Sequence, residues 1–157
     1  MRLCSLIIFI LVFSTNIFAA DKPNAIHGKW VCEPFEDIIT KDVIFVVDLS
    51  IEYKSDGEAI QTEAWKLKGQ ENNIWFTLDL LGTWKSEGSK LTEVLLEERL
   101  VSISDYEKMP DIKVMKDIIK SVNSKTKTAE SIILESNQSR LTTKNIKSNK
   151  VTNCLKA

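Results

Sequence analysis

The sequence predicts a mostly β fold, an antiparallel meandering barrel of about eight strands with one amphipathic helix. Apolar and polar residues alternate along several segments, which is the period of a strand with one buried face. Turn-forming residues separate these segments, which follow one another directly along the chain. Short connections favour an antiparallel meander, because a parallel sheet needs long crossovers. The pattern leaves open whether the barrel is complete.

The longest alternating segment spans residues 43–54. Every odd position from Val43 to Tyr53 is apolar and most even positions are polar, which predicts a long half-buried strand. Ser55-Asp56-Gly57 follows and contains turn-forming residues. Residues 59–67 are therefore expected to return as the second strand of a hairpin.

Two registers of this hairpin remain open. A two-residue loop at Asp56-Gly57 places one set of return-strand residues on the face of Phe45 and Leu49: Ile60, Thr62 and Ala64. A bulged loop with Gly57 in the left-handed region places another set there: Gln61, Glu63 and Trp65. Both registers put small or polar residues inward, and a barrel lined partly by such residues can keep a cavity.

Further strands follow along the chain. A strand beginning at Gly28-Lys29-Trp30 opens the fold, and the later strands are expected at 73–81, 91–104, 131–135, 140–144 and 151–155. Gly82 is expected to break or kink the chain before Thr83-Trp84-Lys85 continues to the next turn. The apolar phase changes near Leu100, which predicts a bulge or a register change.

A different pattern begins at Pro110. Apolar residues then recur at helical spacing as far as Val122. Asp111 early and Lys120 late suit the dipole of a helix. We therefore expect one amphipathic helix over residues 110–122.

Residues 1–19 have the features of a secretory signal peptide. Arg2 precedes an apolar run over residues 3–13, and polar residues follow. We expect cleavage after Ala19, because this leaves a small residue at −1 and the tolerated Ile17 at −3. The apolar run is shorter than the about 20 residues that span a bilayer, so no stable membrane insertion is expected after cleavage. Residues 20–157 then form a single exported domain.

Two cysteines remain in the expected mature chain, Cys32 and Cys154, near its two ends. In an oxidising compartment such a pair favours a disulfide, and closing so long a loop contributes about 4–5 kcal/mol in the chain-entropy model. Two independent buried thiols are the alternative. A redox motif would require cysteines close together in the sequence.

Composition and motifs argue against enzymatic and nucleic-acid functions. The 21 basic and 22 acidic residues give a net charge of −1, which supplies no basic field for nucleic acid. The single histidine, His27, is expected to be solvated or hydrogen-bonded. Glu93 and Glu97 share a face of a predicted strand, but solvent-facing glutamates are commoner there than paired catalytic acids. With no phosphate-loop, zinc or EF-hand spacing, we expect no catalytic residue, cofactor or metal.

Several of these residues resemble a known family. Gly28-Lys29-Trp30, the Asp56-Gly57 turn and the later Gly82-Thr83-Trp84-Lys85 segment are similar to the small exported lipocalin-like (calycin) barrels of bacteria, whose opening strand carries Gly-x-Trp. The resemblance implies that Trp30 packs across the base of the barrel and closes it. It also favours the periplasm over full secretion. Structural roles are expected for a set of residues on these motifs: Gly28, Trp30, Gly57, Gly82 and Trp84.

Two functions from different classes remain. The first is a monomeric binding protein that encloses a small apolar ligand, with expected contacts from Phe45, Leu49, Tyr53, Trp65 and Trp75. The first three face inward in either hairpin register, whereas Trp75 is out of phase with its apolar neighbours and is a candidate for a second surface. The second function is an inhibitor or immunity-type module with a filled barrel that contacts an envelope or host protein. Asn137-Gln138-Ser139 is a glycosylation sequon only if the source glycosylates there.

Overall fold

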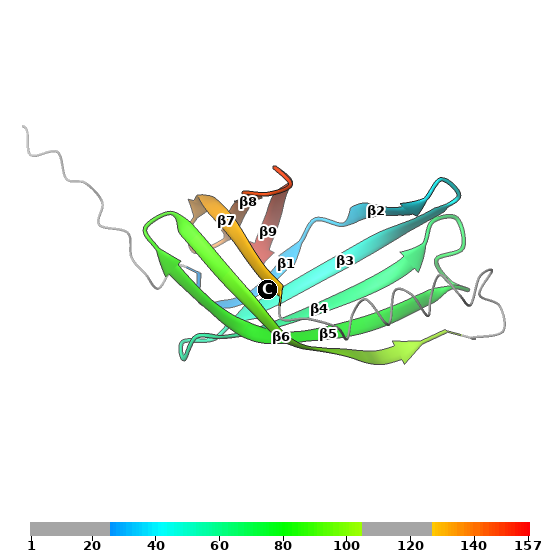
Figure 1. Cartoon of the computed structure of the whole chain (residues 1–157), viewed down its shortest axis with the longest axis horizontal. Helices are drawn as coiled ribbons and strands as arrows, with labels where there is room; N and C mark the ends of the chain where they lie inside the picture. Colours follow the sequence, from blue (N-terminus) through cyan, green and yellow to red (C-terminus); the bar gives the residue numbers. More distant parts are fainter. Residues whose placement is uncertain (1–25, 105–126) are drawn as a thin grey trace, which may run out of the picture.

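The computed structural model describes residues 26–104 and 127–157. The expected signal peptide and the expected helix at 110–122 lie outside these residues. The described residues form nine antiparallel strands (Figure 1): β1 (Gly28–Cys32), β2 (Phe35–Thr40), β3 (Val43–Tyr53), β4 (Glu58–Leu67), β5 (Trp75–Glu87), β6 (Lys90–Ile103), β7 (Lys127–Ser136), β8 (Arg140–Asn145) and β9 (Val151–Lys156). The predicted β meander is confirmed.

The sheet closes into a barrel of eight strands. Strands β3 to β8 each pair with the next strand in chain order, and β1 pairs with both β9 and β3. The sequence did not predict β2 as a separate strand. It pairs with the first half of β3, whereas β1 pairs with the second half, so β1 and β2 form one wall interrupted at Glu33-Pro34. Proline has no N–H to donate to a sheet, which accounts for the interruption.

The hairpin of β3 and β4 adopts the bulged register. Leu49 lies opposite Glu63 and Val47 lies opposite Trp65, so Glu63 and Trp65 share the inner face with Leu49. The N–H of Lys54 donates to the carbonyl of Glu58 across the turn, at 2.9 Å. Gly57 has a φ of +87°, a left-handed backbone conformation that residues other than glycine rarely adopt. The bulged alternative is therefore the one that the structure shows.

Strand β5 runs through Gly82 without a break. The pairing between β5 and β6 shifts at this point, from Leu81 opposite Glu97 to Gly82 opposite Leu95. A Cβ atom added at Gly82 would lie 2.2 Å from the carbonyl oxygen of Val94, so only glycine permits this close approach. A second shift occurs beside Leu100, where the sequence predicted one.

Two clusters of buried side chains form the core. One surrounds Trp30, Tyr53 and Trp84, and the other surrounds Phe45, Val47 and Phe76. Strand β7 pairs with β6 only as far as Leu95, so the second half of β6 pairs with β5 alone. In Figure 1, β3 to β6 accordingly extend beyond the shorter strands β7 to β9. The first cluster thus lies in the closed ring, and the second lies under the extended strands.

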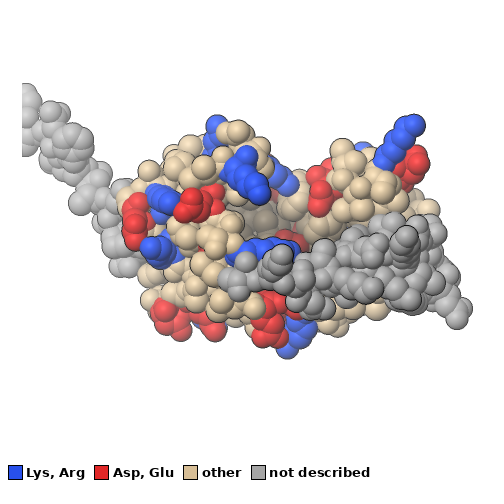
Figure 2. Space-filling view, viewed as in Figure 1, with Lys and Arg blue, Asp and Glu red and all other residues tan. Residues whose placement is uncertain are grey.

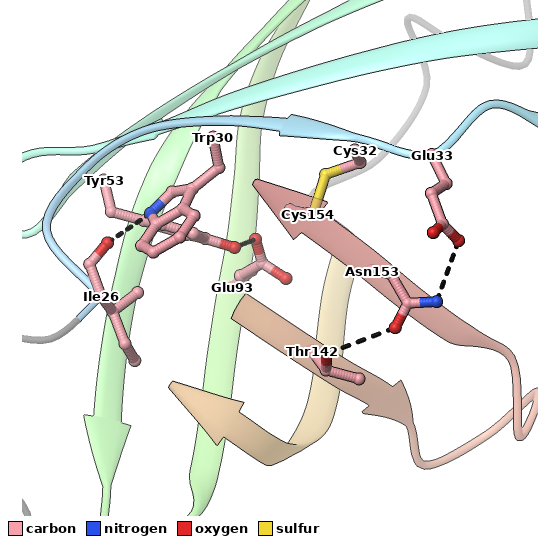
Figure 3. The surroundings of a disulfide bond; sticks show 9 residues. All are labelled: Ile26, Trp30, Cys32, Glu33, Tyr53, Glu93, Thr142, Asn153 and Cys154. Carbon is pink, nitrogen blue, oxygen red and sulfur yellow. Dashed lines mark hydrogen bonds between the residues drawn. A yellow bond between two sulfur atoms is a disulfide. The ribbon is translucent and has the colours of Figure 1, made fainter. Parts of the chain in front are cut away.

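The predicted disulfide joins the strands at which the ring closes. Cys32 of β1 and Cys154 of β9 are direct register partners and are bonded (Figure 3). Beside them, Trp30 is fully buried, and its indole N–H donates to the carbonyl of Ile26 at 2.6 Å. Lys156 lies over the same indole ring, with its ammonium 4.2 Å from the ring centroid. The structural role expected of Trp30 is consistent with this position.

Candidate functional site

A cavity of about 220 Å³ lies inside the barrel between β3 and β7. Its apolar wall includes Ile51, Leu80 and Leu95. A polar side chain comes from Gln61, and the charged groups are Glu93 and Lys127. Figure 2 shows the surface hollowed between the two halves of the molecule, with basic and acidic atoms beside the hollow. Apolar walls with a few polar groups are the usual composition of a small-molecule pocket.

Small residues on neighbouring strands leave this space open. Ala59 of β4 lies opposite Gly82 of β5, and both line the cavity. Ala129 of β7 also lines it and lies opposite Glu93 of β6. Because a glycine and two alanines contribute almost no side-chain volume, the barrel interior is not filled at this level.

Glu93 is held from the far side of the barrel. The hydroxyl of Tyr53, on β3, donates to Oε1 of Glu93, on β6, at 2.8 Å (Figure 3). Burial raises the pKa of Glu93, and the hydrogen bond from Tyr53 opposes this rise. Burial and the neighbouring carboxylate together raise the pKa of Tyr53, so its hydroxyl remains a donor.

Glu63 accepts two hydrogen bonds from its own strand. The side-chain amide of Gln61 donates at 2.5 Å and the indole N–H of Trp65 donates at 2.8 Å. Burial raises the pKa of Glu63, these two donors lower it, and the charge of Asp37 on β2 raises it. Gln61 lines the cavity, and Glu63 orients the side-chain amide of Gln61 by accepting its hydrogen bond.

Glu98 is a third carboxylate on the inner face of the barrel. Its side chain is 7% exposed, and the ammonium of Lys127 lies 3.7 Å from its Oε2. That oxygen is buried and has no hydrogen-bond partner. Burial raises the pKa of Glu98, and the charge of Lys127 lowers it. Glu98 lies opposite Leu80, a residue of the cavity wall.

Glu93 and Glu97 lie on opposite faces of β6. Glu93 and Glu97 were predicted to share a face, but the register shift between Gly82 and Leu81 inserts one extra residue in β6. Glu97 is therefore exposed, and Glu98 takes the inner face in its place. This prediction was wrong because a bulge reverses the alternation of side chains beyond it.

The residues expected to bind a ligand do not form the cavity wall. Phe45, Leu49 and Tyr53 face inward as predicted, and Trp65 does so in the bulged register, but these residues pack in the two core clusters. Trp75 lies opposite Lys66, on the outer face of the sheet. None of these five residues lines the cavity of about 220 Å³.

The remaining structural residues and His27 lie near the closed ring. The indole N–H of Trp84 donates to the carbonyl of Lys54 at 3.0 Å, and the ring of His27 contacts Trp84 edge-on at 5.2 Å. Gly28 has a φ of +110° at the start of β1. In the part of the chain that the structure describes, no three metal-ligating side chains are grouped to hold an ion.

No protein-family model matches the chain, and no curated protein matches its sequence. Within residues 26–104 and 127–157, no helix is long and apolar enough to cross a membrane.

Proposed function

We propose that this protein is an exported, non-enzymatic binding protein that encloses a small ligand in its barrel. The observation that carries the proposal is the cavity of about 220 Å³ with an apolar wall and a few polar groups. The cavity is smaller than the about 300–1,000 Å³ that is common for ligand pockets, so it suits only a small molecule with a short apolar part.

The proposal places the protein among the lipocalin-like barrels. A closed antiparallel barrel and the buried Trp30 of the Gly-x-Trp segment support this assignment. The disulfide supports an oxidising compartment, and with the expected signal peptide it favours the periplasm. We also propose that the protein is a monomer and has no nucleic-acid partner. Its net charge of −1 supports the second of these points, because it supplies no basic field for nucleic acid.

A protein-interaction module is the second candidate. It is favoured by Ile38, Leu96 and Val101, large apolar residues that are more than half exposed on β2 and β6. Such residues often contribute to protein interfaces when they form a contiguous patch.

Native mass spectrometry of the protein, purified gently from its source, tests the binding function. A retained small molecule appears as added mass. Filling the cavity with Ala59→Leu should abolish this mass and the binding of apolar fluorescent probes. Ala64→Leu, on the same strand but opposite Asp48 on the outer face, is the matched control and should leave both unchanged. Only the apo mass, together with no probe binding at micromolar concentration, would favour the interaction module.

A further inference from the structure

The charged side chains of the cavity wall already have partners within the protein. The described residues of the wall include one acidic and one basic side chain, Glu93 and Lys127. The hydroxyl of Tyr53 donates to Glu93 at 2.8 Å, and the ammonium of Lys127 lies 3.7 Å from a carboxylate oxygen of Glu98. Among these described residues, an ionic group of a ligand therefore meets no unpaired charge of opposite sign.

The carboxylate of Glu63, beside this wall, is engaged in the same way. The side chains of Gln61 and Trp65 donate to its two oxygens. Burial lowers the pKa of Lys150, and the negative charges of Asp37 and Glu63 oppose this effect, so Lys150 faces both carboxylates. Moving an ionic group out of water without a compensating partner is costly. The interior of the barrel thus favours an uncharged ligand.

Gln61 is a neutral polar side chain in the cavity wall. It lies opposite Ile51 on β3 and Leu80 on β5, and these two residues also line the cavity. Because a carboxylate only accepts hydrogen bonds, Glu63 is bound by the amide nitrogen of Gln61. Within the described part of the chain, the carbonyl oxygen of this amide accepts no hydrogen bond. That oxygen is therefore an acceptor that Gln61 offers to a ligand.

We infer that the ligand is a small uncharged alcohol whose hydroxyl donates a hydrogen bond to the side-chain carbonyl of Gln61. The hydrocarbon part of the alcohol then lies against the apolar side chains of the wall, Ile51, Leu80 and Leu95. A hydroxyl supplies a hydrogen-bond donor without a charge. An ammonium or a carboxylate would instead bring a charge that this wall does not compensate. This inference rests on the proposed binding function and adds the chemical class of the ligand.

Four probes of similar size test the inference: hexanol, hexylamine, hexanoate and methyl pentyl ether, an isomer of hexanol without a hydroxyl donor. Their affinities for the mature chain, with its disulfide intact, are measured by calorimetry at neutral pH. We expect hexanol to bind at least about tenfold more tightly than either charged probe, because each of these would bury an uncompensated charge. Hexanol should bind about two- to tenfold more tightly than the ether, the range of one net hydrogen bond.

One variant and a matched control connect the hydroxyl preference to the site. Gln61→Met keeps an unbranched side chain of similar length but removes the carbonyl acceptor, so it should bind hexanol and the ether with equal affinity. Gln70→Met makes the same change at an exposed position between β4 and β5 and should keep the wild-type ratio of the two affinities. Tryptophan fluorescence and melting temperature establish that each variant is folded, and the four wild-type affinities test the inference without any variant.

The possible outcomes separate the inference from the function it rests on. If a charged probe or the ether binds the wild type as tightly as hexanol, the alcohol assignment is overturned and the binding function stays intact. Binding of none of the probes overturns both. A hydroxyl preference that survives Gln61→Met in a folded variant also overturns the assignment, because Gln61 supplies the acceptor.

Discussion

Tyr53 and Glu93 are hydrogen-bonded across the barrel interior, although their strands, β3 and β6, do not pair with each other. The sheet order separates these strands by β4 and β5, so this contact crosses the barrel and does not follow the sheet. Ala59, opposite Tyr53, and Gly82, opposite Ala59, are small enough to leave the path between the two side chains open. The same small residues that make the cavity therefore permit the contact.

The first prediction is that Glu93→Gln makes stability less dependent on pH. Burial raises the folded-state pKa of Glu93 above its ordinary value of 4.5, so the folded state holds this proton more tightly than the unfolded state does. The contribution of protonated Glu93 to the free energy of unfolding is therefore complete below about pH 4.5. This contribution is lost as the pH rises through the folded-state pKa of Glu93. The variant, which stays neutral and still accepts from Tyr53, should match the wild type near pH 4 and exceed its free energy of unfolding near pH 8.

Urea unfolding at a series of pH values measures this difference. Glu97→Gln, exposed on the outer face of the same strand, is the control and should follow the wild-type profile. A Glu93→Gln variant that is less stable than the wild type near pH 8 would contradict the assigned direction of the Glu93 pKa.

The second prediction concerns Trp30. Trp30→Ala removes a fully buried indole from the core and leaves the carbonyl of Ile26 without its side-chain donor. We expect a loss of about 3–5 kcal/mol in the free energy of unfolding, as for other buried aromatic truncations. Val31→Ala, next in β1 but 54% exposed, should change it by less than about 1 kcal/mol. Similar losses for the two variants in chemical denaturation would show that Trp30 is not a core residue.

The third prediction is that reduction of Cys32–Cys154 destabilises the barrel. The bond spans 122 residues of sequence and joins β1 to β9, whose backbone pairing covers only Trp30 to Cys32 on β1. Chain entropy for so long a loop gives about 4–5 kcal/mol, which is a large share of the stability of a domain of this size. Differential scanning calorimetry with and without reductant should show a fall of many degrees in melting temperature.

Mapping of non-reduced peptides provides the accompanying check. A single linked peptide pair containing Cys32 and Cys154 is expected in protein isolated from its native compartment. Two free thiols in that protein would refute both the bond and the inference of an oxidising compartment.

Sequence periodicity predicted most of the strands, because a half-buried strand has apolar and polar residues in alternation along its own sequence. It did not predict β2, whose six residues are too few to separate from the preceding strand. The acids of the cavity were harder to place. Glu63 faces inward in one of the two registers that the sequence allowed, whereas Glu98 faces inward only because β6 contains a bulge at Gly82. A bulge of this kind depends on a close contact between two strands, which no local pattern records.

The last prediction tests that contact. Gly82→Ala places a Cβ atom 2.2 Å from the carbonyl oxygen of Val94, so the backbone of β5 or β6 must move. We expect a loss of about 1–3 kcal/mol, the usual cost of overpacking an interior, and faster amide exchange at Val94 and Leu95. Gly69→Ala is the comparison, because no atom lies within 4 Å of its added Cβ. It should lower the free energy of unfolding by about 1–2 kcal/mol, only because alanine is strained in the left-handed backbone conformation of Gly69. If Gly69→Ala alone alters exchange at Val94 and Leu95, or if Gly82→Ala leaves it unchanged, Gly82 does not set the bulge that turns Glu98 inward.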